Sequence, residues 1–483
     1  MTSPSPRPAV AIVGGGIAGL AAAFFLRDRD LDVTVLEGSP RLGGKLAVSP
    51  IAGVAVDEGA EALLARRPEG TDLIGALGLA DQLRTPGTTS SRIWTRGSLH
   101  PLPRRQFMGV PADVDELGGS GILSPAGAAR ARDDLRLPPT PRDGDVAVAD
   151  FVGARFGPEL VDRLVDPLLG GVYAGRSDQL SFEATLGDLA RASRHYRSLA
   201  EAAGSLLPAP ASGPAPGPAR PVFTTLAGGL GTLPAAVAAA SGAAARTSAM
   251  TRELARIHRG WRLTIGPTRA PERFDADAVI LAVPARPASR LLSGLAGAGP
   301  ASASAALGEF SYASMAIVTL AYRAGAFPGP PEGSGYLVPA VDGHAVKAVT
   351  FSTVKWPHLR PEDSGLVIVR CSVGRVGEEA LLQRDDRELA GLAAADLAAA
   401  TGVRGAPAAA RVSRWGGGLP QYTVGHGDRV SRIRAGVATQ PGLAVCGAAY
   451  DGVGIPACIA SARLAAGQVL AYLETRDALA VGQ

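Results

Sequence analysis

The sequence is poor in the side chains that hold metals or form disulfides. Its 483 residues include 3 cysteines and 6 histidines, and none stands in the CxxC or HExxH spacing that is typical of zinc sites. Cys371, Cys446 and Cys458 lie in apolar surroundings, which favours reduced and buried thiols. We therefore expect no metal centre and no disulfide framework.

Lysine is scarce, aromatic residues make up only 5% of the chain, and no block of basic residues occurs. The formal net charge of +4 is too small and too dispersed to predict a nucleic-acid partner. A mildly basic chain would instead suit an anionic substrate. The GxSxG turn of serine hydrolases is also absent from the sequence.

Long apolar runs are missing as well. The longest, residues 8–26, contains three consecutive glycines, which would weaken a membrane-spanning helix. The short leader before it holds one Arg and no cleavage-like boundary. We expect a cytoplasmic protein that at most touches the inner face of the membrane peripherally.

What the chain does contain is glycine in ordered clusters. Gly14-x-Gly16-x-x-Gly19 follows an apolar run at residues 9–13 and opens a helical stretch. These glycines allow a tight turn and close approach of the backbone to a pyrophosphate at a helix N-terminus. Glu37 ends the next predicted strand, where a carboxylate can accept hydrogen bonds from ribose hydroxyls. The pattern predicts a dinucleotide site.

The first cluster continues beyond what a nicotinamide site needs. Residues 37–45 form an ExxxRxGGK pattern, with Arg41, Gly43 and Gly44 extending the phosphate-binding surface, and this pattern resembles the flavin amine oxidase superfamily. We find no second fingerprint for a nicotinamide cofactor, because GGLGTLP at residues 228–234 lacks the third glycine and follows no convincing strand. The resemblance implies that the cofactor is FAD.

Another glycine cluster precedes the last helical stretch. Gly447, Gly452 and Gly454 stand just before a helix that is predicted to begin near Pro456, since Pro is favoured in a first turn. The backbone N–H groups of residues 453–455 would then face a ligand from the positive end of this helix. Such groups can stabilise negative charge on a reduced flavin.

Six further segments resemble the protoporphyrinogen/coproporphyrinogen oxidases of haem synthesis, a family within the same superfamily. GVYAG, GYLVP and LPQYTVGH together are specific to this family rather than to amine oxidases in general. The six segments span nearly the whole chain: DPLLGGVYAGRSDQLS (166–181), TLAGGLGTLP (225–234), GSGYLVP (333–339), TFSTVKWP (350–357), RWGGGLPQYTVGH (414–426) and YDGVGIPACI (450–459).

The resemblance also implies which residues form the site. No acid or base is implied as a catalytic group. The implied substrate slot consists of Gly171, Tyr173, Gly335 and Leu337. By charge and position, the candidates for the substrate carboxylates are Arg96, Arg104, Arg105 and Arg176, and the alternative for each is a solvated surface arginine. The implied flavin contacts are Gly14, Gly15, Gly16, Ile17, Ala18, Gly19, Glu37, Gly38, Lys45, Gly59, Ala60, Glu61, Ala62, Met250, Trp415, Val453, Gly454 and Ile455.

The expected fold is α/β, with a Rossmann-like FAD-binding domain, a substrate-binding sheet domain and a helical lobe that are discontinuous in sequence. Besides the first βαβ unit, we expect a hairpin at 93–103, strands at 261–265, 278–283, 314–322 and 365–373, and a helix at 387–400. The expected bounds are 1–95, 221–290 and 411–483 for the FAD domain, 96–112 and 291–410 for the substrate domain, 113–206 for the helical lobe, and 207–220 for a flexible Pro/Ala/Gly loop.

Members of this family remove six electrons from a porphyrinogen and form hydrogen peroxide from molecular oxygen. The Arg-rich, Lys-poor composition resembles that of proteins from high-GC actinobacteria, which are associated with the coproporphyrin branch of haem synthesis. The expected substrate is therefore coproporphyrinogen III, and a downstream haem-pathway enzyme is a candidate partner. Three alternatives stay open: protoporphyrinogen IX as substrate, an amine oxidase or carotenoid desaturase-like enzyme, and a non-catalytic flavoprotein.

Overall fold

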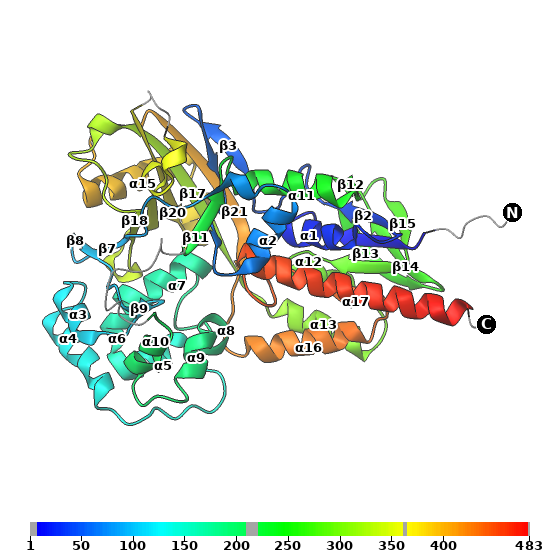
Figure 1. Cartoon of the computed structure of the whole chain (residues 1–483), viewed down its shortest axis with the longest axis horizontal. Coiled ribbons are helices and arrows are strands. Elements are labelled where there is room, and N and C mark those ends of the chain that lie inside the picture. Colours follow the sequence, from blue (N-terminus) through cyan, green and yellow to red (C-terminus); the bar gives the residue numbers. More distant parts are fainter. Residues whose placement is uncertain (1–6, 209–220, 361–364, 482–483) are drawn as a thin grey trace.

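The computed structural model describes residues 7–208, 221–360 and 365–481, which form two large sheets and a separate group of helices (Figure 1). Residues 209–220 of the predicted flexible loop lie outside the described residues. The α/β class expected from the sequence is confirmed. The two predicted glycine clusters, although far apart in sequence, follow strands of the same sheet.

The first sheet has five strands, all parallel. Its central strand is buried on both faces, because alternate side chains point to opposite sides: Val10 and Ile12 enter one core, while Ala11 and Val13 enter the other. In sheet order the strands are β12 (Ala244–Arg246), β2 (Asp32–Leu36), β1 (Ala9–Val13), β16 (Ala278–Leu281) and β22 (Leu443–Val445).

Two different layers cover this parallel sheet (Figure 1). One face packs against helices α1 (Ile17–Leu26), α11 (Leu233–Ser241) and α17 (Ile455–Val481). The other face packs against a small antiparallel sheet and three helices: β13 (Thr251–Ile257), β14 (Gly260–Ile265), β15 (Glu272–Ala276), α12 (Ala285–Ser293), α13 (Ala298–Gly308) and α16 (His426–Ala438).

Helix α17 is the one helix among the described residues that is long and apolar enough to cross a membrane. Its apolar window is 56% buried, and the helix packs along α1. Both features are those of a core helix in a folded domain.

The second sheet has seven strands and a helix on one face. Helix α15 (Asp386–Thr401) covers that face with a core that includes Leu389, Ala393 and Leu397. In sheet order the strands are β21 (Ala409–Pro420), β17 (Tyr312–Arg323), β20 (Leu366–Val373), β19 (Val346–Phe351), β18 (Gly335–Leu337), β7 (Arg92–Thr95) and β8 (Ser98–Pro101).

The helical lobe is organised around a buried ion pair. Asp134 and Arg155 are 0% and 2% exposed, with the Arg155 Nε 2.5 Å from Asp134. The carboxylate also accepts hydrogen bonds from Ser198 and from two backbone N–H groups, so the buried charges are fully paired. The helices are α3 (Val114–Gly119), α4 (Pro125–Ala131), α5 (Val148–Phe156), α6 (Pro158–Leu160), α7 (Asp166–Tyr173), α8 (Phe182–Thr185), α9 (Gly187–Ala192) and α10 (Leu199–Ser205).

Short elements link these three parts. A turn of π-helix at Val161–Val165 directly precedes α7, a kind of irregularity that is frequent next to functional sites. The other short elements are β3 (Val48–Ile51), β4 (Val54–Asp57), β5 (Leu63–Leu64), β6 (Leu83–Arg84), β9 (Gln106–Phe107), β10 (Val110–Pro111), β11 (Phe223–Leu226), α2 (Pro68–Ala76) and α14 (Ser352–Lys355).

The predicted hairpin, strands and α15 are confirmed to within a few residues. One expected domain boundary, at 410/411, falls inside β21, which begins at Ala409, and another, at 95/96, separates β7 from its hairpin partner β8. The division of the chain into three domains remains our proposal, with β7 and all of β21 assigned to the substrate domain.

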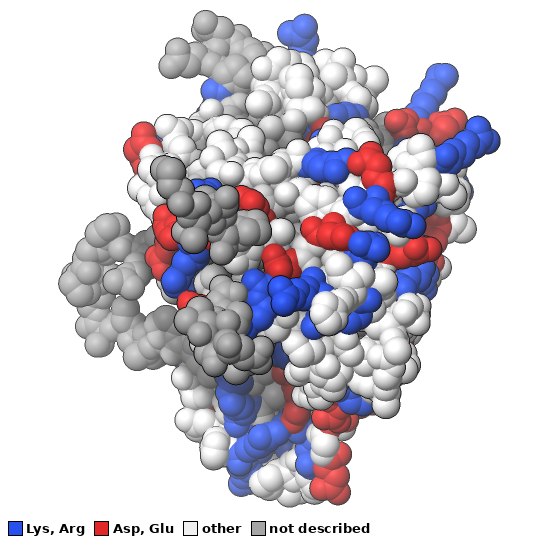
Figure 2. Space-filling view, turned by 90° about the vertical axis from the view of Figure 1, so that its right-hand side faces the viewer, with Lys and Arg blue, Asp and Glu red and all other residues white. Residues whose placement is uncertain are grey.

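Positive and negative side chains are interspersed at the end of the molecule that carries β13–β15 (Figure 2). Arg262 pairs with Asp275 there, and Arg246 pairs with Glu272, each at 2.6 Å. This face therefore carries paired charges rather than the basic stripe that a nucleic acid would need.

Candidate flavin and substrate site

The first glycine cluster forms the tight turn between β1 and α1. A Cβ at Gly14 would lie 2.5 Å from the carbonyl oxygen of Ala282, and one at Gly19 would lie 1.9 Å from the carbonyl oxygen of Gly14. Both positions therefore exclude any side chain. Gly16 is the N-cap of α1 and faces open space. The turn thus leaves room for a phosphate at the positive end of the helix.

Glu37 lies at the carboxyl end of β2, beside this turn. Its Oε2 accepts a hydrogen bond from the N–H of Gly15 at 2.7 Å, and its Oε1 accepts one from the N–H of Ser39 at 2.7 Å. A Cβ at Gly38 would lie 2.7 Å from Cε of Met250, whose side chain is 49% exposed. The predicted adenosine contacts Glu37, Gly38 and Met250 are therefore brought together.

The paired glycines lie directly against the turn. Gly43 N–H donates to the carbonyl oxygen of Gly15 at 2.8 Å, and a Cβ at Gly44 would lie 3.2 Å from Cα of Gly16. The Arg41 guanidinium donates to three carbonyl oxygens of its own loop, including that of Gly44 at 2.7 Å. Arg41 therefore shapes the loop, and its part in the phosphate-binding surface stays a prediction.

Lys45, Gly59 and Trp415 also meet. A Cβ at Gly59 would lie 2.1 Å from the carbonyl oxygen of Lys45 and 3.2 Å from the Trp415 ring. The indole N–H of Trp415 donates to the carbonyl oxygen of Glu58 at 3.0 Å. Burial lowers the pKa of Lys45. These contacts fix the start of the predicted flavin segment 59–62 against β21.

The side chain of Glu61 ties that same segment to the second sheet. It forms ion pairs with Lys355, at 2.7 Å, and with Arg370, which also donates to the carbonyl oxygen of Gly59. Burial alone would raise the pKa of Glu61, but the two cations lower it to about 2. Glu61 is therefore an anion that holds the backbone of Ala60 and Ala62 in place.

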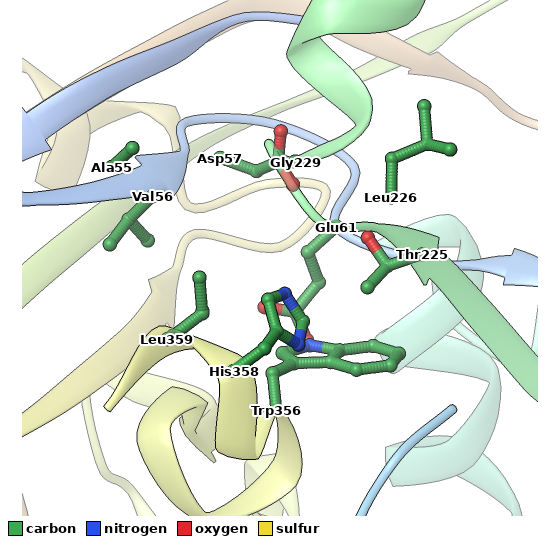
Figure 3. Close-up of a pocket in the computed structure, with 10 residues that line it drawn as sticks. All are labelled: Ala55, Val56, Asp57, Glu61, Thr225, Leu226, Gly229, Trp356, His358 and Leu359. Carbon is green, nitrogen blue, oxygen red and sulfur yellow. The ribbon is translucent and has the colours of Figure 1, made fainter. Parts of the chain in front are cut away.

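A shallow pocket that Glu61 helps to line lies beside the glycine segment 228–234 (Figure 3). Asp57 lines it, and its carboxylate accepts hydrogen bonds from the N–H groups of Leu230 and Gly231 at 3.0 and 2.7 Å. The expectation that no strand precedes this glycine segment is wrong, because β11 ends at Leu226. The helix that follows this segment nevertheless binds Asp57 at its N-terminus, so the amides of Leu230 and Gly231 are already occupied.

The C-terminal glycine cluster presents free backbone donors. Helix α17 begins at Ile455, one residue before the predicted Pro456. The N–H groups of Val453 and Gly454 donate to no acceptor in the part of the chain that the structure describes. Unpaired donors at the positive end of a 27-residue helix suit the electron-rich edge of a flavin ring. The residues present therefore fit FAD.

The structure brings two residues of the predicted substrate slot together. Gly171 on α7 faces Leu337 on β18: a Cβ at Gly171 would lie 3.5 Å from Cδ2 of Leu337. Tyr173 is buried beneath them. At Gly335 the sheet itself excludes a side chain, because a Cβ there would lie 1.9 Å from the carbonyl oxygen of Val349 on β19. Its contact with the substrate stays a prediction.

Part of the second sheet's face opposite α15 is only half buried. At one end of β17, β19 and β20, fully buried residues that face α15 alternate with partly exposed ones, so the exposed set shares one face, whereas Ala321 and Ile368 further along that face are fully buried. Leu337 belongs to that set, and α7 contacts β18 and β19. The set includes Met315, Ile317, Leu337, Ala348, Thr350, Ser372 and Trp415.

The four predicted arginines lie at the surface, and three already have partners. Arg176 pairs with Asp178 at 2.6 Å, and Arg96 lies 3.7 Å from Glu159. Arg105 donates to the carbonyl oxygen of Pro208. The guanidinium of Arg104 has no hydrogen-bond or ion-pair partner among the described residues.

Sequence reasoning missed a cationic pair close to the slot. Lys347 is 4% exposed, and its Nζ donates to the carbonyl oxygen of Gly374 at 2.7 Å. Arg375 donates to the carbonyl oxygen of Val338, one residue after Leu337. Burial, with a contribution from Arg375, lowers the pKa of Lys347 to about 7. The scarcity of lysine was the signal that could have identified this residue.

Comparisons with known proteins agree with this geometry. The family model described as flavin-containing amine oxidoreductase matches residues 17–470. A coproporphyrinogen III oxidase from Mycobacterium bovis is 37% identical over 473 residues, covering 97% of this chain and 98% of that protein. The protein of that name from Bacillus subtilis is 31% identical, covering 96% and 98%.

A solved structure shares the same overall arrangement. The crystal structure of a protein from Exiguobacterium sp. 255-15, provisionally assigned as a protoporphyrinogen oxidase, superposes with a TM-score of 0.84. It is 32% identical to this chain, and the match covers 97% of this chain and 99% of that one.

Proposed function

Because the chain belongs to the family of flavin-containing amine oxidoreductases, we propose that it is a coproporphyrinogen III oxidase, which converts coproporphyrinogen III to coproporphyrin III in haem synthesis. The observation that carries this proposal is its similarity, along nearly the whole chain, to proteins of that name. FAD is the cofactor of the enzyme. Molecular oxygen, reduced to hydrogen peroxide, is the proposed electron acceptor.

Bound FAD supplies the oxidation, by accepting hydride equivalents from the substrate and passing the electrons on. The chain itself has three tasks. Gly14–Gly19 and Glu37 hold the two ends of the adenosine diphosphate half. The amides of Val453 and Gly454 stabilise negative charge at the edge of the flavin ring. Between them, segment 59–62 is held rigidly by Glu61 and its two cations.

The substrate has to lie flat between α7 and the half-buried face of the second sheet. Gly171 and Leu337 lie at the edge of that place, because a Cβ added at Gly171 would come 3.5 Å from Cδ2 of Leu337. The substrate would therefore lie beside this contact, against the side of α7 where Gly171 carries no side chain. We propose that Arg104, whose guanidinium is free within the described residues, binds a substrate carboxylate. Arg96, Arg105 and Arg176 would have to exchange their present partners to do the same.

Protoporphyrinogen IX is the second candidate substrate. The observation that favours it is the similarity to the Exiguobacterium protein, whose provisional name is that of an enzyme acting on this compound. The two substrates differ in the number of carboxylates, so cationic side chains around the slot would decide between them.

The test is to supply both porphyrinogens in parallel to the purified, FAD-loaded protein. Oxygen uptake and the rise of porphyrin fluorescence are measured for each. Faster turnover of coproporphyrinogen III supports the proposal, whereas preference for protoporphyrinogen IX would replace it with the second candidate. If neither porphyrinogen is oxidised, an amine and a carotene are supplied in the same assay. Turnover of either would support an amine oxidase or a carotenoid desaturase-like enzyme, and no turnover of any substrate would support a non-catalytic flavoprotein.

We also propose that the protein acts in the cytoplasm. The one membrane-length helix of the described chain is committed to the core of the first sheet. Contact with the inner face of the membrane, or with a downstream enzyme of haem synthesis, would therefore have to use surface side chains.

A further inference from the structure

The segment after β21 runs between the two halves of the proposed site. The Gln421 side chain donates from Nε2 to the carbonyl oxygen of Tyr173 at 2.8 Å. The ring of Tyr422 packs against the ring of Tyr173, with centroids 5.6 Å apart. The backbone oxygen of Tyr422 accepts the N–H of Ser181 at 2.8 Å. This segment is therefore fixed to the helical lobe at the end of α7.

The hydroxyl of Tyr422 reaches the other half. Its Oη donates to the carbonyl oxygen of Ala448 and accepts from the N–H of Gly452, both at 2.7 Å. The side chain is 2% exposed, and burial raises the pKa of the phenol above its usual value. The hydroxyl therefore stays protonated and can act as a donor and an acceptor together. One group thus closes both ends of the 448–452 turn.

This turn decides where the next amides point. Gly452 has a φ of +143°, and a Cβ there would lie 2.7 Å from Cβ of Ala457. The position has to be glycine, which imposes little conformational restraint of its own. The hydrogen bond to Tyr422 supplies that restraint. Val453 and Gly454, with their unpaired N–H groups, follow immediately.

The ring of Tyr422 is itself held in place. The imidazole of His426 stacks on it, with ring centroids 3.7 Å apart and planes at 17°. The Nε2 of His426 lies 2.9 Å from the carbonyl oxygen of Tyr450, which belongs to the same turn. A packed ring with a fixed hydroxyl can hold backbone groups to within the tolerance that a cofactor contact needs.

We infer that Tyr422 is a positioning residue for the flavin. Its hydroxyl holds the 448–452 turn so that the amides of Val453 and Gly454 meet the flavin edge that becomes negative on reduction. Its backbone and ring tie this turn to the end of α7, next to the substrate slot. The inference rests on the flavin-dependent function proposed above, but not on which porphyrinogen is the substrate.

The test compares wild-type holoenzyme with Tyr422→Phe, which keeps the ring and removes both hydrogen bonds. The reduction potential of bound FAD is measured together with the dissociation constant for sulfite, a probe that leaves negative charge on the flavin ring. We expect a more negative potential and a sulfite dissociation constant raised about three- to tenfold. Neither measurement uses a porphyrinogen, so the substrate proposal can fail without affecting this result.

Tyr312→Phe is the matched control. Its Oη accepts the N–H of Ala285 at 2.7 Å, so this variant also loses a partly buried hydrogen bond between a tyrosine hydroxyl and the backbone, one where Tyr422→Phe loses two. We expect a comparable loss of stability with no change in potential or in sulfite binding. Unchanged values in Tyr422→Phe, or an equal shift in Tyr312→Phe, would overturn the inference.

A second replacement covers the case in which Tyr422→Phe does not retain FAD. Incorporation of 3,5-difluorotyrosine at position 422 keeps the ring and the hydroxyl, but makes the phenol a stronger donor and a weaker acceptor. We expect the flavin potential to change with this replacement and to stay constant when the same residue is placed at position 312. A potential that is unchanged at position 422 would contradict a positioning role.

Discussion

All lysines of this chain lie near the proposed site. Its positive charge is carried mostly by arginine, and the three lysines are Lys45, Lys347 and Lys355. The carbonyl oxygen of Lys45 lies against Gly59, and Lys355 pairs with Glu61. Lys347 is buried, and its carbonyl oxygen accepts the N–H of Val338, the residue after Leu337. A compact ammonium fits such places, where the planar fork of arginine would need more acceptors. Composition alone showed that lysine was rare, but not that all three lysines are buried or half-buried near the proposed site.

Replacement of Lys347 by Met should change how stability depends on pH. The pKa of Lys347 is lowered to about 7, whereas the unfolded chain titrates near the ordinary value of 10.5. Between these values the unfolded state binds more protons, so the wild type should gain stability as pH rises, by up to about 1.4 kcal/mol per pH unit. Lys347→Met should lack that gain.

Urea unfolding of both proteins at pH 6.5, 8 and 9.5 checks this expectation. The variant should be more stable than the wild type at the lowest pH, where the buried ammonium is charged, and the difference should shrink as pH rises. Parallel pH profiles of the two proteins would show that Lys347 is not a buried titrating group.

The absence of a side chain at Gly171 should set access to the slot. In Gly171→Val, a branched side chain would fill the approach to Leu337, where a Cβ alone already comes within 3.5 Å. We expect KM for the porphyrinogen to rise at least about tenfold, with FAD content unchanged.

Gly391→Val is the control for the Gly171 variant, because Gly391 is another exposed helical glycine and a Cβ there would meet nothing within 4 Å. Both variants pay a similar cost in helix stability. An equal rise of KM in the two variants would remove Gly171 from the slot.

At the scale of elements, the turn between β1 and α1 shows two kinds of glycine requirement. Gly14 and Gly19 are required by the fold itself, since a Cβ at either would meet a backbone oxygen at 2.5 Å or less. Gly16 is different, because nothing in the protein lies within 4 Å of its Cβ position. Only a ligand at the N-terminus of α1 would require glycine there.

Gly16→Ala should therefore fold normally and bind FAD poorly. We expect an unchanged unfolding midpoint for the apoprotein and a dissociation constant for FAD raised about tenfold or more, because a methyl group would occupy the place of the pyrophosphate. Gly75→Ala on α2, where a Cβ also meets open space, is the control and should change neither quantity. Tight FAD binding by Gly16→Ala would place the phosphates elsewhere.

At the scale of the whole molecule, Glu61 links two parts that are distant in sequence. It follows β4, while its partners Lys355 and Arg370 belong to α14 and β20. Glu61→Gln should leave both cations without their anion in a site where all three side chains are 17% exposed or less, which costs about 3–5 kcal/mol for a buried pair. The thermal unfolding midpoint should fall accordingly.

The same ion pairs should make the wild type sensitive to acid. The pKa of Glu61 is lowered to about 2 from an ordinary value of 4.5. Its stabilisation is therefore complete above about pH 5 and is lost as pH falls toward 2. Acid unfolding followed by flavin fluorescence should show a steeper loss of stability for the wild type than for Glu61→Gln. Equal slopes would contradict the strength of these ion pairs.

The sequence by itself determined the cofactor half of this protein. Gly14, Gly19 and Glu37 follow short-range rules, because a tight turn, a helix N-terminus and the end of the next strand are all set within about thirty residues. The position of α17 and its glycine cluster followed from the same local logic. The α/β class, the flavin and the family could therefore be predicted from linear patterns.

Only the tertiary structure decided how the distant segments meet. Long-range pairing places Leu337 opposite Gly171, and it shows that Gly335 serves a strand and Arg41 its own loop. The link between Tyr422 and the turn at Gly452 joins the substrate sheet to the flavin helix. Such contacts depend on side-chain direction and on burial between separate layers, which no local pattern encodes.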